Sequence, residues 1–304
     1  MLTPDQREFY ATNGYLHLPS FFETKDVDSI NAYHEDAWRQ KPNDVSVDHL
    51  DTGKRSRMSQ LSEEDSHGRF KINDLYMKDE GFRDALVSYR LSMVLEHLMV
   101  DRPVLINTLS IEFGTQQGMH LDSLYMTPHS PFNLVGVWVA LEDGAEDTGP
   151  LFYYPKSHLI KPYKFSNGRF GAVSDEMKHW ESYMKEEIRR YDLKREVFIP
   201  KKGDVLIWSA YLLHGGSPVK DHGKTRKSIV SHYFAESDAR RAYPGKVVES
   251  EGGLWLKKKP VFHNELSSSS LKNPLVSFIK SSKLEKPARK ILNLSRKIQG
   301  VVGP

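Results

Sequence analysis

Four residues that could bind a metal ion and an acid stand far apart in the sequence. His120 and Asp122 lie in GMHLDSLYM, His214 in LLHGGSP and Arg226 in GKTRKSIVSHYF. Two histidines and one carboxylate are the ligand set of a 2-His-1-carboxylate Fe(II) site, which leaves other coordination positions open. An arginine could bind the far carboxylate of a metal-bound 2-oxo acid through a bidentate pair. If the fold brings these four side chains together, the sequence predicts oxygen activation.

Each of these residues also has a plainer interpretation. On a strand, His120 and Asp122 would share one face as two ligands must, but such a pair is also an ordinary polar strand end. His214 follows the apolar run DVLIWSAYLL and precedes two glycines that permit close approach, so it could equally be a metal ligand or a buried core histidine. Arg226 has lysines on either side, so its plainer interpretation is an exposed charge at the start of a strand.

Composition excludes several other kinds of site. The 304-residue chain has no cysteine, which rules out disulfides, thiolate metal sites and a cysteine nucleophile. It has no apolar run of about 18 residues that could span a membrane. Its start, MLTPDQREFY, lacks the basic and apolar regions of a signal peptide. No glycine-rich phosphate loop, G-x-S-x-G or H-E-x-x-H motif is found. We therefore predict a cytoplasmic protein with no transmembrane segment.

The elements that must position the four residues follow from the changing period of the apolar residues. Helical spacing precedes residue 103, and short β-type runs bounded by Gly, Pro and Asp follow it. Many short strands of this kind are typical of an antiparallel sandwich or closed sheet. We expect helices at 3–13, 25–40, 82–99 and 174–191, strands at 15–22, 104–113, 133–143, 151–155, 195–200, 204–210 and 228–234, and a long loop at 41–70.

Charge divides the chain unevenly. Residues 251–304 contain 11 Lys/Arg and three Asp/Glu, a net charge of +8, so the preceding 250 residues carry −5. We predict one domain over 1–250, with its β core at about 103–235, and a basic, helical extension over 251–304. Such an extension could contact an anionic membrane, but Pro287 interrupts its apolar face, so packing on the body is favoured. Its low aromatic content argues against nucleic-acid binding.

Several segments together resemble the phytanoyl-CoA dioxygenase family of Fe(II)/2-oxoglutarate oxygenases. The opening LTPDQREFYATNGYLHLPSFF is similar to the family's first helix and strand. GMHLDSLYM, GVWVALEDGAEDTGPLFYYPKSH and GDVLIWSAYLLHGGSP with TRKSIVSHYF follow in the family's order, so the resemblance covers about residues 2–235. It implies a mainly β fold with flanking helices, whose core is a double-stranded β-helix (a jelly roll, or cupin-like fold).

The resemblance also implies roles for particular residues. His120, Asp122 and His214 would bind Fe(II), and Arg226 would pair with 2-oxoglutarate, the co-substrate used with O2. Trp138, Lys71 and Leu109 match family positions beside that co-substrate. Gly216 stands where some members have a serine that bonds the co-substrate, so Ser217 or another group would serve instead. Residues that neighbour the site in sequence, and so are candidate substrate contacts, are Asn107, Gln117, Tyr125 and Tyr153.

The expected activity is oxidation, most simply hydroxylation, of an unactivated C–H bond in a small or medium-sized organic substrate, with release of succinate and CO2. The polar and aromatic candidate contacts favour a polar small molecule over a fatty acyl-CoA. Two alternatives stay open: a jelly-roll protein that binds a metal or a sugar without oxygen chemistry, and a cupin-like isomerase. Neither alternative needs Arg226, so binding of 2-oxoglutarate distinguishes them from an oxygenase.

Overall fold

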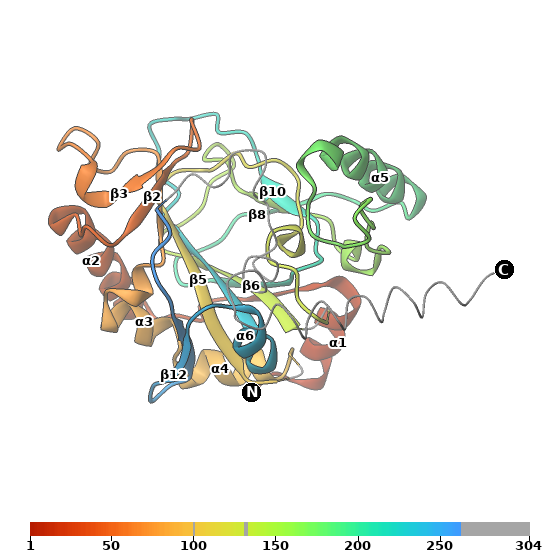
Figure 1. Cartoon of the computed structure of the whole chain (residues 1–304), viewed down its shortest axis with the longest axis horizontal. Coiled ribbons are helices and arrows are strands. Elements are labelled where there is room, and N and C mark those ends of the chain that lie inside the picture. Colours follow the sequence, from red (N-terminus) through yellow and green to blue (C-terminus); the bar gives the residue numbers. More distant parts are fainter. Residues whose placement is uncertain (100, 131–132, 263–304) are drawn as a thin grey trace, which may run out of the picture.

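The computed structural model describes residues 1–99, 101–130 and 133–262, and antiparallel strands dominate it (Figure 1). This confirms the expected mainly β architecture with flanking helices. The strands are β1 (Tyr15–Leu18), β2 (Ser46–His49), β3 (Arg55–Arg57), β4 (Phe70–Asn73), β5 (Pro103–Ile111), β6 (Leu134–Ala140), β7 (Leu151–Tyr153), β8 (Glu196–Phe198), β9 (Val205–Ser209), β10 (His214–Gly216), β11 (Ser228–Ala235), β12 (Lys246–Glu249) and β13 (Leu254–Lys257).

The strands form one large and one small sheet. The ten-stranded sheet runs β1-β9-β6-β11-β5-β4-β2-β3, with the β12–β13 hairpin joined to β5 through β13. The small sheet has the order β10-β7-β8. Every pairing is antiparallel except that of β13 with β5. The sheet order brings together strands that are far apart in the sequence, such as β5 and β11, on which several of the candidate site residues lie.

Helices cover one face of the large sheet. Side chains of β6 point alternately to the two faces of this sheet and so join two different hydrophobic clusters. Val135, Val137 and Val139 pack in a cluster with residues of the N-terminal helices. Trp138 and Ala140, from the same strand, join a second cluster with residues of the small sheet. Helix α5 lies at the opposite end of the molecule from α2 (Figure 1). The helices are α1 (Pro4–Asn13), α2 (Thr24–Gln40), α3 (Glu80–Leu86), α4 (Tyr89–Glu96), α5 (Met177–Arg190) and α6 (Glu236–Ala242).

Three sequence expectations are corrected before residue 103. The segment 41–70 is not a plain loop, because it contains β2 and β3, and β4 begins at its end. The strand expected at 15–22 stops at Leu18. The helix expected at 82–99 is two helices, since Val87 and Ser88 leave helical geometry, with Ser88 extended at φ −58° and ψ 146°. The first helix agrees with its prediction, and Thr3 and Gln6 form a capping box at its start.

The region after residue 235 also differs from its expectation. Residues 254–257 were expected in a helical extension, but they form β13 and pair with β5. The Tyr76 hydroxyl donates to the carbonyl of Leu256 at 2.7 Å, and the guanidinium of Arg83 lies over the Trp255 ring at 4.5 Å. A boundary at 250 would therefore cut a hairpin that belongs to the body. Residues 263–304, the rest of the predicted extension, lie outside the described residues.

Candidate metal centre

The fold brings His120, Asp122 and His214 together in one buried cluster. His214 begins β10, and the backbone of His120 pairs with it through two hydrogen bonds, of 2.9 and 3.1 Å. Asp122 opens a short 3₁₀ helix directly after this bridge. One potential ligand atom from each side chain lies within 4.8 Å of the others, and no other such group occurs among the described residues. The backbone bridge thus sets the separation of the two histidines.

Both imidazoles are oriented so that one particular nitrogen faces the cluster. His120 Nδ1 donates to the carbonyl of Gly118 at 2.8 Å, and His214 Nδ1 donates to the carbonyl of Leu212 at 2.9 Å. With Nδ1 carrying the hydrogen, each Nε2 presents its lone pair to the cluster, where a metal ion could bind it; that of His120 has the Gln117 amide nitrogen 3.3 Å away. Burial, followed by the proximity of His214, lowers the pKa of His120 to about 3, so this ring is neutral at pH 7.

The two carboxylate oxygens of Asp122 have different neighbours. Oδ1 lies 3.8 Å from His120 Nε2 and 3.6 Å from His214 Nε2. Oδ2 accepts a hydrogen bond from the indole of Trp208 at 2.7 Å. Although burial opposes the charged form, the neighbouring His214 and His232 hold the pKa of Asp122 well below its usual range. The geometry therefore presents one charged oxygen, Oδ1, to a cation between the three side chains.

Two glycines make room for this arrangement. Gly136 pairs with Trp208 across β6 and β9, and a Cβ at Gly136 would lie 2.4 Å from the indole ring. A Cβ at Gly216 would lie 3.0 Å from the backbone nitrogen of Gln116, in the loop before His120. Close approach of backbone or ring at both places requires a residue without a side chain. The sequence predicted this use for the glycines after His214, but not for Gly136.

The cluster lies in the wall of a cavity of about 530 Å³. Its size suits a small ligand. All three ligand candidates line it, and so do the predicted co-substrate residues Arg226, Trp138, Lys71 and Leu109 and the predicted substrate residues Asn107, Gln117 and Tyr125.

Arg226 is a buried cation with few partners. It is 4% exposed, and its Nη1 donates to the carbonyl of Gly149 at 3.0 Å. Its Nε has no hydrogen-bond partner, and no carboxylate in the described part of the chain forms an ion pair with it. Burial lowers its pKa to about 10, so it stays charged at pH 7. A buried, largely unpaired guanidinium is costly unless an anion binds to it, and the Trp138 ring lies beside it at 5.8 Å.

Lys71 is a second cation of this kind. Its side chain lines the cavity from β4, and burial lowers its pKa. Within the described ranges it has no hydrogen-bond or ion-pair partner. The cavity thus offers two cations to an acidic ligand beside the candidate metal position.

Three candidate ligand contacts have other partners. Asn107 donates from Nδ2 to Asp74 at 3.0 Å, and its Oδ1 accepts from His232 at 3.1 Å, so both ends of its amide are engaged. Tyr153 packs on Tyr15 with ring centroids 4.5 Å apart and does not line the cavity. The Ser217 hydroxyl accepts from Arg195 at 2.8 Å, also away from the cavity wall. These contacts argue against direct ligand binding by the three residues.

Sequence reasoning missed several polar residues of the cavity wall. Trp208 and His232 both contact Asp122, and Lys258, which follows β13, pairs with Asp74 at 2.8 Å. Arg55 and Asp48, on the β2–β3 hairpin, form a two-point ion pair. A signal was present for His232, because it stands on β11 at even spacing from Arg226 and Val230, which line the same cavity. None was present for Lys258 or the hairpin.

Comparison with known sequences places these observations in one family. The family model described as phytanoyl-CoA dioxygenase (PhyH) matches residues 10–228. The peroxisomal phytanoyl-CoA dioxygenase of Mus musculus is 27% identical over 263 residues, which covers 79% of this chain and 70% of that protein. A phytanoyl-CoA dioxygenase of Arabidopsis thaliana is 24% identical over 287 residues, covering 84% of this chain and 92% of the relative.

Comparison with solved structures confirms the cupin-like jelly roll. The non-haem α-ketoglutarate-dependent carbocyclase SnoK from nogalamycin biosynthesis aligns with a TM-score of 0.59 and 16% identity, covering 84% of this chain and 96% of SnoK. EctD from S. alaskensis, solved with 2-oxoglutarate and 5-hydroxyectoine, aligns with a TM-score of 0.55 and 15% identity, covering 78% of this chain and 77% of EctD. At these identities the likeness concerns the fold.

Proposed function

Since the chain belongs to the phytanoyl-CoA dioxygenase family and is a 2-oxoglutarate-dependent non-haem iron dioxygenase that uses Fe(II), 2-oxoglutarate and O2, we propose that it oxidises an unactivated C–H bond. Hydroxylation of a small or medium-sized organic substrate, with release of succinate and CO2, is the simplest such reaction. Asp122 fills the third protein-ligand position, so a halide has no place there, which favours an oxygen-transferring or other non-halogenating outcome.

In this proposal His120, Asp122 and His214 hold the iron. Their ligand atoms, all within 4.8 Å of one another, form a three-residue set that leaves coordination positions for small ligands. Iron, 2-oxoglutarate and O2 supply the oxidising power when bound, while the protein orients the reactants and excludes water. Arg226 and Lys71 bind the acidic co-substrate by charge, and Trp138 and Leu109 form apolar walls beside it.

The buried Arg226 is the observation that carries the proposal. A metal- or sugar-binding jelly roll, or a cupin-like isomerase, has no use for an unpaired guanidinium in the cavity wall. A dicarboxylic 2-oxo acid does use one, because one end can chelate the metal while the other pairs with the arginine. The orphaned Nε of Arg226 is therefore explained by the co-substrate and not by the alternatives.

The polar lining of the cavity supports a polar small-molecule substrate. Gln117 and Tyr125 lie beside the metal ligands, with Gln117 Nε2 3.3 Å from His120 Nε2. The Asp48–Arg55 pair and Lys258 add further charged groups to the cavity wall. Such groups favour a substrate with hydrogen-bonding or charged substituents. No nucleic acid is expected as a partner, and a cytoplasmic location stays a prediction.

Oxygen-dependent formation of succinate from 2-oxoglutarate tests the proposed function. Metal-free protein should form none, added Fe(II) should restore it, and Asp122→Ala should abolish it because the carboxylate ligand is lost. Pools of polar metabolites would then be screened for compounds that increase the rate and gain one oxygen atom by mass. Full turnover by a folded, clean preparation of Asp122→Ala would overturn the assignment of the iron site.

A further inference from the structure

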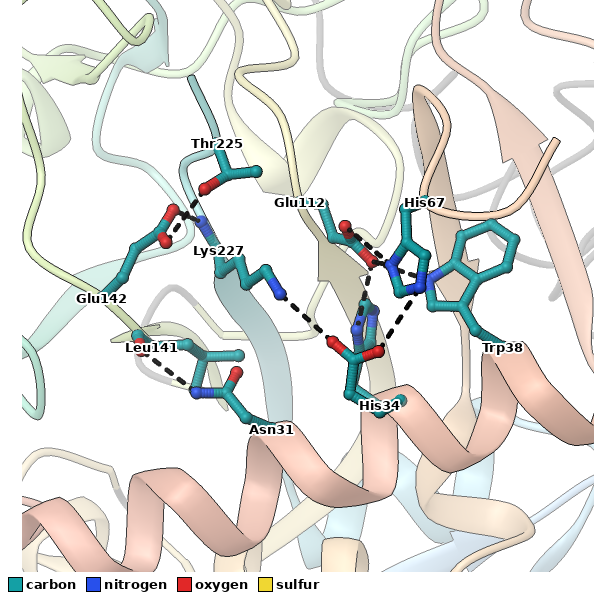
Figure 2. Close-up of polar contacts among 10 residues, drawn as sticks. Asn31, His34, Trp38, His67, Glu112, Leu141, Glu142, Thr225 and Lys227 are labelled. Atoms are coloured by element: carbon teal, nitrogen blue, oxygen red, sulfur yellow. Dashed lines mark hydrogen bonds and ion pairs between the residues drawn. The ribbon is translucent and has the colours of Figure 1, made fainter. Parts of the chain in front are cut away.

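One carboxylate holds the chain on both sides of Arg226. Glu142, which follows β6, accepts the Thr225 hydroxyl through Oε2 at 2.9 Å and the Lys227 amide through Oε1 at 2.6 Å (Figure 2). Because the two bonds use the two oxygens of one group, the residue between Thr225 and Lys227 cannot shift without breaking at least one of them. We call Glu142 with these two contacts the Glu142 clamp.

The backbone on either side of the clamp is itself anchored. The amide of Arg226 donates to the carbonyl of Glu112 at 2.6 Å, and the amide of Leu141 donates to the carbonyl of Lys227 at 3.0 Å. The Glu112 side chain is buried and accepts from the indole of Trp38, on α2, at 2.6 Å (Figure 2). The entry to β11 is therefore connected to both neighbouring strands, β5 and β6.

Helix α2 supports the same region from outside. Asn31 donates to the carbonyl of Leu141 at 3.2 Å (Figure 2), and Lys227 Nζ forms an ion pair with Glu35 at 3.2 Å. The Lys227–Glu35 pair is partly exposed, so it contributes little by itself. The two charge-assisted bonds of Glu142 are the stronger restraint, since an ionised acceptor strengthens a hydrogen bond.

Arg226 needs such support because little else holds its side chain. Apart from packing beside Trp138, the side chain has one hydrogen bond, from Nη1 to Gly149, and an unpartnered Nε, so its direction depends largely on where the backbone lies. Recognition of a carboxylate by two parallel hydrogen bonds depends on direction as well as on charge. We propose that Glu142 is a positioning residue for Arg226 and so sets the affinity of the site for the second carboxylate of 2-oxoglutarate; the proposal rests on the proposed function.

Binding of two 2-oxo acids to the Fe(II)-loaded protein under anaerobic conditions tests the clamp. 2-Oxoglutarate carries the second carboxylate, whereas 2-oxopentanoate has the same chain length without it. Glu142→Ala should weaken 2-oxoglutarate binding by about tenfold, as expected for a misplaced binding group. Affinity for 2-oxopentanoate and for Fe(II) should stay unchanged, because those ligands do not use Arg226. A loss of general structure would not produce this difference.

Three further variants keep the test decisive. Thr225→Val removes only one hydroxyl contact and should lower 2-oxoglutarate affinity by a smaller factor, even if Glu142→Ala fails to fold. Glu142→Gln retains an acceptor for the Lys227 amide and should fall between wild type and Glu142→Ala. Glu146 lies in the same loop, and its exposed carboxylate makes no hydrogen bond or ion pair with a described residue. The Glu146→Ala variant should therefore bind 2-oxoglutarate like wild type.

The outcomes separate the two proposals. Unchanged 2-oxoglutarate affinity in folded Glu142→Ala and Thr225→Val would overturn the positioning role while leaving the proposed function intact. Equal weakening of both 2-oxo acids would also overturn it, since the effect would then not pass through the second carboxylate. Failure of the wild type to bind 2-oxoglutarate would overturn the proposed function, and the role of the clamp with it.

Discussion

The two carboxylate oxygens of Asp122 have different roles. Oδ1 faces the two histidine nitrogens, while Oδ2 is held by the Trp208 indole at 2.7 Å, with His232 Nε2 at 3.5 Å. Partners of this kind, outside the metal ligands, orient the ligands and tune their basicity. The indole bond therefore leaves Oδ1 as the carboxylate oxygen that would bind the iron.

Replacing Trp208 by Phe should show what this hydrogen bond contributes. The ring remains, but Oδ2 loses a donor in a buried place, which we expect to cost about 2 kcal/mol of the free energy of unfolding. Fe(II) affinity should fall by about tenfold. Fluorescence or calorimetric titration with Fe(II), with chemical denaturation in parallel, would measure both.

Trp180→Phe is the matched control for this substitution. Trp180 is 1% exposed and packs in the cluster around α5, and its indole makes no hydrogen bond to a described residue. The Trp180→Phe variant should be less stable only because a smaller ring packs less well, and it should bind Fe(II) as the wild type does. If Trp208→Phe bound Fe(II) as tightly as this control, the indole would have no role in orienting Asp122.

Residue types predicted the cluster of His120, Asp122 and His214, although only His214 begins a strand. His120 pairs with it through an isolated bridge, and Asp122 opens a 3₁₀ helix and not the strand that was expected. The even spacing of Arg226 and His232 is compatible with one shared face, but the sequence alone left the face of His232 open. Tyr153 could not be judged in this way. Tyr153 pairs with His214 in the small sheet, but Tyr15, from a strand far earlier in the chain, packs against its ring.

At the scale of elements, β6 and β9 must approach closely for Trp208 to reach Asp122. Gly136 allows this approach, since any side chain there would meet the indole. Gly136→Ala should therefore destabilise the fold by about 2 kcal/mol through overpacking and weaken Fe(II) binding through displacement of Trp208. Urea denaturation and an Fe(II) titration would test these two effects.

Gly118→Ala is the control for this change. A Cβ at Gly118 would have no atom within 4 Å, and the carbonyl that accepts from His120 would be retained. Its stability should stay within about 0.5 kcal/mol of wild type, as for most surface changes. Equal stability of the two alanine variants would contradict the close-packing explanation of Gly136.

Elements with a sustained pattern were predictable, and short ones were not. The apolar runs of β5, β6, β9 and β11 and the capping box of α1 all gave clear signals. The strands β2 and β3 have only four and three residues, SVDH and RSR; β2 is stabilised by pairing with β4, and β3 by pairing with β2. The single helix predicted at 82–99 was wrong for a different reason: the apolar residues of α3 and α4 keep one helical spacing across Val87 and Ser88, so the sequence does not show the break. The strand pairings of β2, by contrast, depend on residues distant in the sequence and leave no local pattern.

At the scale of the whole molecule, the basic C-terminal region contrasts with an acidic body. None of the helices in 1–99, 101–130 or 133–262 is long and apolar enough to cross a membrane. We expect the chain with and without residues 267–304 to sediment equally with vesicles that contain anionic lipid, since Pro287 interrupts any continuous apolar face. Neutral vesicles are the control, and salt-sensitive sedimentation of the full chain alone would contradict the prediction.

The relatives show how widely this architecture is used. The solved structures with the same fold include a carbocyclase, an epimerase and EctD bound to 5-hydroxyectoine. In this chain, the cavity wall that could distinguish substrates is built from the β2–β3 hairpin and from Lys258 after β13, both outside the core strands. If the core strands carry the iron and 2-oxoglutarate chemistry, as we propose, these peripheral elements are where substrate choice should be sought.

Anaerobic titration of the metal-free protein with Fe(II) and then 2-oxoglutarate tests the central claim most directly. We predict a visible charge-transfer band from the chelated 2-oxo acid in the wild type. Arg226→Ala should need at least about tenfold more 2-oxoglutarate to reach the same band, because a buried charge-assisted pair is lost, and Arg226→Lys should fall between them. A folded, iron-loaded wild type that gives no band at saturating 2-oxoglutarate would contradict the account.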